Sequence, residues 1–344
     1  MKAKRFGSVK FILGAAVLAA AVVLPRFVSN YYLSIFVEIA LFAYLSSAWN
    51  ILGGFAGQFS LGHALYVGLG AYTSTVLFNN WGISPWLGML AGGLLATLVG
   101  ILIGVPCFKL SGTFYTLASL ALCTITMLLF QSTQKIGDIR IGGGTGLPVK
   151  AVPGNNFWLL QFRDKIYYYY VMLAFLAAIL LLCRFIKRSK IGYQLAAVAN
   201  DQNAAEALGV NSRNLKLKAM ALSTFTAAMG GTLYAQYIMA CSPAKLFGEP
   251  LSDEFVIISL IGGKGTILGP TIGACIIKPL AQLTTATFGA SLPGLSLAIY
   301  GILLVVCIRF FPDGLYSLLI RLKNRLAEKA ARRRSVGERA EVKK

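Results

Sequence analysis

Three polar side chains lie close together in a stretch that is otherwise glycine and apolar residues: Gln58, Ser60 and His63. His63 is the only histidine of the chain. An imidazole can carry a proton, whereas amide and hydroxyl groups can line a polar path or join helices through hydrogen bonds. The stretch therefore predicts either the lining of a path or a close helix contact. For His63, hydrogen-bonded helix packing is favoured over proton transfer.

Other kinds of chemistry find little support in the residues. A lone histidine cannot build a histidine metal cluster, and the six cysteines are scattered without a CxxC spacing, which favours small buried hydrophobes. The segment 263–266 reads Gly-Lys-Gly-Thr, but a phosphate loop needs Ser or Thr directly after the lysine. We expect no catalytic residue, no metal and no cofactor.

Two charged residues interrupt apolar runs, Glu38 and Lys278. A charge at membrane depth costs a few kcal/mol and is a functional candidate by default. The alternative is that Glu38 lies near the outer interface, while Lys278 extends to the interface or pairs structurally. We favour that alternative.

The composition indicates a polytopic membrane protein. Of 344 residues, 57% are hydrophobic and 13% are charged, where a soluble domain carries about 25% charged residues. The apolar runs are long and unbroken, which favours helices over a membrane β-barrel. The net charge of +20 is concentrated at residues 2–10, 184–218 and 321–344. This is the positive-inside pattern of a plasma (inner) membrane protein, and it argues against nucleic-acid binding.

The apolar runs predict an all-α fold with about 8–10 membrane segments, including interrupted or re-entrant helices, and both termini in the cytoplasm. Residues 1–320 form the transmembrane domain, with an outer loop at 131–166 and a cytoplasmic loop at 187–216, and 321–344 form a basic cytoplasmic tail. Residues 1–25 also resemble a signal peptide, but an uncleaved first helix is favoured. The expected spans are 9–28, 31–52, 62–78, 85–106, 114–130, 167–186, 217–239, 271–289 and 292–311.

Two glycine-rich stretches, 53–62 and 262–269, are loosely alike and lie in different halves of the chain. Interrupted segments in corresponding positions are typical of an internal repeat around a central path. The spacing does not match residue for residue, so a repeat and coincidence both stay open. Residues 252–266 are predicted to form a half-helix with an unwound continuation.

The cytoplasmic loop contains a short predicted helix, 194–208, that ends at Gly209. A short helix of small residues with one acid can dock in the groove of a partner protein, or it can be an ordinary amphipathic loop helix. The composition alone does not separate these two interpretations.

Five ordered motifs resemble the permease subunit of branched-chain amino acid ABC importers over almost the whole chain. They are Gly57-Gln58 with Ser60-Leu61-Gly62-His63-Ala64 and Gly70-Ala71-Tyr72; Gly142-Gly143 with Gly146-Leu147; Ala204 to Gly209; Gly262-Gly263, Gly265-Thr266, Gly269-Pro270 and Gly273-Ala274; and Pro312-Asp313-Gly314-Leu315.

The resemblance implies a non-catalytic permease that works with two ABC ATPase subunits, a homologous permease with which it forms a heterodimer, and an extracytoplasmic solute-binding protein. It implies that the coupling surface toward the ATPase comprises Ala204, Ala205, Glu206, Ala207 and Gly209. Gln58, Ser60 and His63 are candidates for the translocation path, although close helix packing also accounts for the glycines around them. Members of this family usually carry arginines and a further acid just before the coupling segment. Here those positions hold Tyr193, Ala196, Ala199 and Gln202.

The substrate implied is a branched-chain or related amino acid, with urea or short amides as alternatives within the family. A stand-alone, ion-coupled secondary transporter is the rival from another class, and Glu38 would be its titrating carboxylate. A membrane enzyme is the third interpretation, for which the sequence offers no catalytic cluster.

Overall fold

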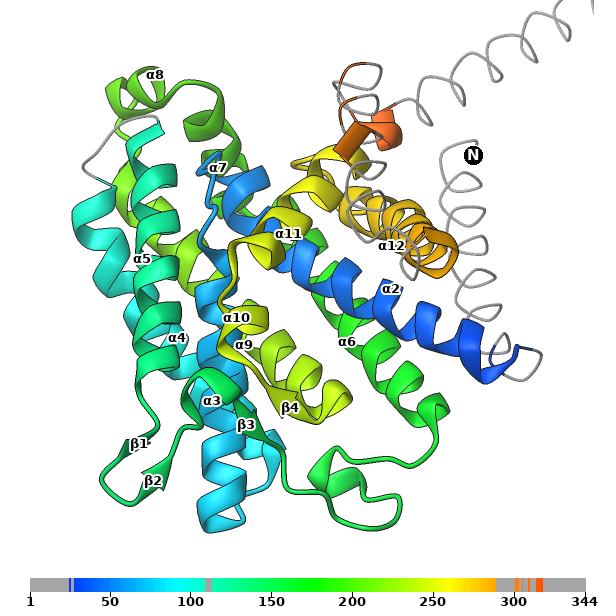
Figure 1. The fold of residues 1–344 in the computed structure, drawn as a ribbon. Helices are drawn as coiled ribbons and strands as arrows, with labels where there is room; N and C mark the ends of the chain where they lie inside the picture. Colours follow the sequence, from blue (N-terminus) through cyan, green and yellow to red (C-terminus); the bar gives the residue numbers. More distant parts are fainter. Residues whose placement is uncertain are drawn as a thin grey trace, which may run out of the picture.

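The computed structural model describes residues 28–108 and 113–288, together with Pro25, residues 301, 302, 305 and 309, and residues 314–317. Within these residues the chain forms a bundle of helices with four two-residue strands (Figure 1). The all-α fold class is confirmed. Apart from isolated positions, the spans expected at 9–28 and 292–311 lie outside the described residues, as do the inner turn at 109–112 and the tail 321–344.

The first helix pair contains the predicted interruption. Helix α2 (Asn30–Asn50) continues into a π-helical turn, η2 (Ile51–Phe55), and the chain then leaves helical geometry until α3 (His63–Trp81). A π-helical turn is rare and is found often at functional sites. The glycine-rich stretch of the sequence is therefore a true break between two long helices.

The next helices follow the expected spans closely. Helix α3 ends at Gly82, and Ser84 begins α4 (Pro85–Cys107) by accepting a hydrogen bond from the Trp86 backbone, with proline at the first helical position. Helix α5 (Thr113–Ser132) comes next, and α6 (Lys165–Arg188) follows the long connection.

The connection between α5 and α6 is more structured than the sequence suggested. It contains the hairpin β1 (Lys135–Ile136) and β2 (Ile139–Arg140), the 3-10 turns η3 (Gly143–Thr145) and η4 (Phe157–Leu159), and β3 (Leu147–Pro148). Strand β3 pairs with β4 (Ala240–Cys241), which directly follows α9. This pairing fastens the connection to the end of α9.

The helix predicted at 194–208 is wrong in one respect, because the structure divides the segment into α7 (Lys190–Asn200) and α8 (Gln202–Ala207). Asp201 lies between them in extended conformation, and its side chain accepts a hydrogen bond from the Ala204 backbone at 3.0 Å. An aspartate in this role starts a new helix, which ends the preceding one. Gly209, with φ at +82°, follows the end of α8 as predicted.

The last described helices include a second interruption. After the long helix α9 (Ser212–Ile238) and the short α10 (Pro243–Leu246), α11 (Glu249–Gly262) ends in a non-helical turn at 263–268, from which α12 (Gly269–Phe288) begins. The predicted helix with an unwound continuation is thus present.

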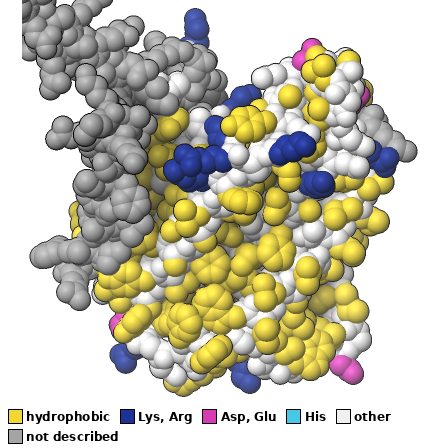
Figure 2. Space-filling view, turned by 180° about the vertical axis from the view of Figure 1, so that it is seen from behind, with side chains coloured by type: hydrophobic (Ala, Val, Ile, Leu, Met, Phe, Trp, Pro, Cys, Tyr) yellow, Lys and Arg dark blue, Asp and Glu magenta, His cyan; other side chains and the backbone are white. Residues whose placement is uncertain are grey.

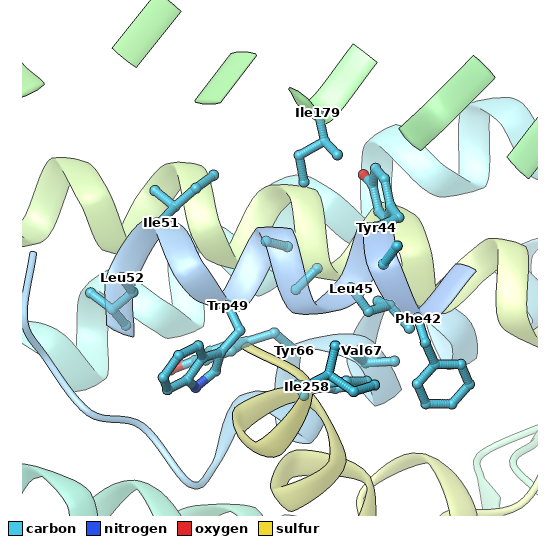
Figure 3. Close-up of a cluster of buried hydrophobic side chains, with 14 of the residues drawn as sticks. Phe42, Tyr44, Leu45, Trp49, Ile51, Leu52, Tyr66, Val67, Ile179 and Ile258 are labelled. Atoms are coloured by element: carbon cyan, nitrogen blue, oxygen red, sulfur yellow. The ribbon is translucent and has the colours of Figure 1, made fainter. Parts of the chain in front are cut away.

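The core lies around α2, α3 and α9. Helices α3, α4 and α9 pack against one another, and α2 lies against α6, α9 and the α11–α12 pair. Side chains of α2, η2, α3, α6 and α11 form one buried cluster (Figure 3). Helices α3 and α9 approach so closely that a methyl group on Gly231 would lie 1.9 Å from the carbonyl oxygen of Val67.

The outer surface of the bundle is hydrophobic. Figure 2 shows a broad apolar face beneath a band of Lys and Arg side chains. Among the described residues, four helical segments are long and apolar enough to cross a membrane: Asn30–Phe55, Pro85–Cys107, Phe114–Ser132 and Lys165–Arg188. Helix α4 exposes a stripe of leucines to the outside. They are Leu87, Leu90, Leu94, Leu98 and Leu102.

The close packing of α3 and α9 leads to a stability prediction. Gly231→Leu forces the two helices apart and should lower the free energy of unfolding by about 3 kcal/mol, the upper end of the usual cost of overpacking. Unfolding by SDS in mixed micelles measures the change. Gly144→Leu, at an exposed position where the nearest atom to an added Cβ is 3.9 Å away, should change it little. Equal effects of the two substitutions would contradict the packing described.

Candidate functional site

The break between η2 and α3 has backbone polar groups satisfied by side chains from two other helices. The Leu61 N–H donates to Ser119 Oγ at 3.1 Å, and the Phe59 carbonyl accepts from Thr116 Oγ1 at 2.9 Å. The Ala64 N–H, in the first turn of α3, donates to Ser252 Oγ at 2.9 Å. At membrane depth a broken helix survives only where protein or water replaces the missing backbone partners. Helices α5 and α11 supply them here.

Ser60 is held in this break through its backbone. Its carbonyl accepts a hydrogen bond from the Trp49 indole N–H at 2.8 Å, and Trp49 itself is fully buried. The Ser60 Oγ is also buried but has no hydrogen-bond partner among the described residues.

His63, the first residue of α3, is fully buried and contacts α9. Its Nε2 lies 2.9 Å from Ser223 Oγ, and that hydroxyl donates to the Ala48 carbonyl at 2.6 Å. Because a serine hydroxyl has one hydrogen, Ser223 must accept from His63, so the proton is on Nε2. His63 therefore joins α2, α3 and α9, as the helix-packing interpretation requires.

Gln58 is half-buried, and its backbone N–H closes the π-helical turn by donating to the Leu52 carbonyl at 3.1 Å. The structure thus places Gln58, Ser60 and His63 on one break in the bundle. Two buried polar atoms here, Ser60 Oγ and His63 Nδ1, lack a partner within the described part of the chain. A buried, unpaired polar atom costs about 1–3 kcal/mol, so these two atoms are the positions where water or a polar solute would bind favourably.

The second break, the turn at 263–268, lies directly against the first. Asn50, the last residue of α2, accepts a hydrogen bond from the Gly265 N–H and donates to the Thr266 carbonyl, both at 2.8 Å. The two glycine-rich stretches that are alike in sequence are therefore neighbours in space.

The two charged residues within apolar runs are also brought together. Lys278 is 8% exposed, and its Nζ lies 2.9 Å from Glu254 Oε1 and 3.7 Å from Glu38 Oε2. The same ammonium lies 3.4 Å from the centre of the Phe42 ring. The structural pairing of Lys278 is confirmed. Its principal partner, Glu254, is one that sequence reasoning missed, because 24 residues separate the two along the chain.

At the other candidate site, the Glu206 carboxylate is bonded within its own loop. It accepts hydrogen bonds from Ser212 Oγ and from Gln202 Nε2, while Lys216 Nζ donates to Gln202 Oε1 at 2.6 Å. The bonds from Ser212 and Gln202 hold the pKa of the Glu206 carboxyl below its usual value. Glu206 is therefore ionised at neutral pH, and these bonds weaken only when acid protonates it.

The remaining residues of the predicted coupling surface divide into two groups. Ala205 is buried, whereas Ala204, Ala207 and Gly209 are exposed. Leu208 lies between Ala207 and Gly209, inside the same motif, but sequence reasoning did not select it. Its side chain is 85% exposed. The Leu208 side chain is therefore accessible to a partner on the surface of this loop.

These features define the class: a polytopic helical membrane protein whose interrupted helices meet inside the bundle. Comparison with known proteins identifies it further. Residues 31–308 match the family described as "Branched-chain amino acid transport system / permease component". The chain belongs to this family, and it is a multi-pass protein of the plasma membrane.

Individual relatives agree with this assignment. The chain is 25% identical over 339 residues to the high-affinity branched-chain amino acid transport system permease protein LivM of Escherichia coli K12, covering 91% of this chain and 77% of that one. It is 24% identical to the fructose import permease protein FruF of Bifidobacterium longum, covering 85% and 80%. It is 25% identical to the nucleoside ABC transporter permease protein NupC of Lactococcus lactis, covering 66% and 73%. No solved structure matches the chain.

The charged group around Lys278 gives a second stability prediction. Lys278→Met leaves Glu254 and Glu38 without their cation and should lower the free energy of unfolding by roughly 2–4 kcal/mol. Adding Glu254→Gln should recover part of this loss, because it removes the stranded charge. SDS unfolding of both variants measures the coupling. Lys264→Met serves as the control because Lys264 is exposed. If Lys278→Met were no more harmful than this control, the ion pair would not stabilise the bundle.

Proposed function

We propose that this chain is the transmembrane permease subunit of an ATP-binding-cassette importer that translocates branched-chain or related amino acids. The observation that carries the proposal is the family match over residues 31–308. The motifs at 57–72 and 204–209, which lie within the matched residues, also resemble those of the family.

The amino-acid substrate is supported by the similarity to the E. coli LivM permease, which covers 91% of this chain. Other relatives are named as permeases for fructose and for nucleosides. Proteins similar to this chain are therefore named for several different polar solutes. Urea and short amides are the alternatives within the family. Uptake of labelled leucine against labelled urea, by vesicles containing the whole importer, separates them.

The partners in this proposal are two ABC ATPase subunits, a homologous permease and an extracytoplasmic binding protein. Between Arg184 and Lys218 the chain carries seven basic residues and two acidic ones, which supports a cytoplasmic position for α7 and α8. The ATPases would bind there. The opposite end, with the β1–β2 hairpin and η4, would then face the binding protein.

Binding of ATP would close the ATPases and move α8, and the bundle would change between outward and inward access. This is a two-state change biased by a ligand bound to another subunit. Gln58, Ser60 and His63 would lie on the path, since two of the buried polar atoms without a partner among the described residues, Ser60 Oγ and His63 Nδ1, belong to the break between η2 and α3.

The rival interpretation, a stand-alone, ion-coupled transporter, predicts a different result. It requires uptake without any ATPase, abolished by Glu38→Gln. In the structure the Glu38 carboxylate lies near the Lys278 ammonium, which favours a structural ion pair. Reconstitution of the chain alone tests this, and ATPase-independent uptake that Glu38→Gln abolishes would overturn the importer.

The exposed side of α8 provides the sharpest test of the coupling surface. Leu208→Asp should abolish co-purification with the ATPase while the bundle stays folded, because it places a charge in an apolar contact. Gly209→Trp should do the same by obstructing the contact. Trp158→Ser, which removes a side chain that is 74% exposed at the opposite end, is the matched control. Co-purification that survives both changes at 208 and 209 would show that α8 is not the docking helix.

A further inference from the structure

One side chain holds both interrupted helices together. The amide of Asn50 is 1% exposed, and it binds two successive residues of the turn at 263–268. Its Oδ1 accepts from the Gly265 N–H and its Nδ2 donates to the Thr266 carbonyl, each at 2.8 Å. A side-chain amide presents an acceptor and a donor side by side, which matches these two backbone groups.

The approach of the two breaks depends on glycine. A methyl group on Gly54, in η2, would lie 1.9 Å from Asn50 Oδ1 and 2.6 Å from the Gly265 backbone nitrogen. No side chain therefore fits between the π-helical turn and the second break. The absence of a Cβ at this position lets the amide reach across.

The turn at 263–268 is also held by Lys187, the first residue of the predicted cytoplasmic loop 187–216. Lys187 Nζ, in the last turn of α6, donates to the Gly265 carbonyl at 2.8 Å. Helix α7 begins three residues later, and its far end lies against the first break, where a methyl group on Gly57 would be 3.1 Å from the Cα atom of Ala199. Both breaks thus contact the segment that leads into α8.

Gly265 consequently has both of its backbone groups bonded to side chains, one from α2 and one from α6. A non-helical turn inside a membrane bundle needs such partners. When α2 or α6 moves, the turn must move with that helix or lose the hydrogen bond to it. The two bonds from Asn50 are part-buried and costly to lose, whereas the bond from Lys187 is exposed and can exchange with water, so Asn50 is the firmer of the two links.

We propose that Asn50 is a positioning residue of the transport cycle, which makes the η2 break and the 263–268 turn move as one body when α6–α8 is displaced. Lys187 is the contact through which that displacement enters. This inference rests on the proposed function, because the displacement is the one that the ATPase would impose on α8.

The test uses the full chain, purified with its ATPase and binding-protein partners and reconstituted in vesicles with ATP inside and labelled leucine outside. Asn50→Leu has nearly the same size but loses both hydrogen bonds to the turn. It should lower the number of leucine molecules transported per ATP hydrolysed roughly fivefold or more, the lower end of the usual range for coupling between sites. A merely structural role would reduce uptake and hydrolysis in proportion and leave that ratio unchanged.

Lys187→Met keeps the test decisive if the variant at Asn50 does not fold, because Lys187 is exposed. It should lower the same ratio. Asn79→Leu is the matched control: the Asn79 amide also binds two backbone groups, donating to the Pro148 carbonyl at 2.9 Å and accepting from the Lys150 N–H at 3.0 Å, but at the opposite end of the bundle. It should keep the wild-type ratio.

The outcomes separate the two proposals. A wild-type assembly without ATP-dependent leucine uptake would overturn the proposed function, and the inference with it. The other outcome concerns the inference alone. If the wild-type assembly transports leucine, and the number of leucine molecules transported per ATP hydrolysed is unchanged in Lys187→Met and in every folded variant at Asn50, the inference is overturned.

Discussion

The structure depends on satisfying the backbone of a helix broken inside an apolar bundle. Between η2 and α3 the chain leaves helical geometry, and its free N–H and carbonyl groups bond to Thr116, Ser119 and Ser252 and to the Trp49 indole. Without these partners each group would cost several kcal/mol in a bilayer. The need for them explains why α5 and α11 carry hydroxyl side chains toward the centre. It also explains why the break can be retained as a functional element.

The second break follows the same rule through different residues. Asn50 and Lys187 bond to the backbone of the 263–268 turn, so α2 and α6 are both joined to the α11–α12 pair. Further along α2, the Lys278 ammonium lies between the carboxylates of Glu254 and Glu38. Polar contacts therefore hold α2 to the α11–α12 pair at its C-terminal end and near its middle. The apolar exterior gives no such specificity, because lipid is as apolar as the leucines of α4.

Much of the fold could be predicted from the sequence, since long apolar runs and positively charged loops are local signals. The helix boundaries of α3, α4 and α5 followed from them. The contacts could not, because Ser119, Ser223 and Ser252 have no sequence property that separates them from other helical serines. The ion pair of Lys278 was foreseen as a possibility but its partner Glu254 was not. Asp201 was overlooked as a helix cap, and Leu208 could be recognised only when its exposure was known.

The central claim is tested most directly by hydrogen exchange at the Leu61 amide in lipid nanodiscs. Exchange should be slow in the wild type and should accelerate in Ser119→Ala, which removes the acceptor 3.1 Å away. Ser132→Ala, on the exposed end of the same helix, should leave it unchanged. Two results would contradict this account: a Leu61 amide that exchanges in the wild type as fast as the exposed turn at Gly137, or a Leu61 exchange rate that is unchanged in Ser119→Ala.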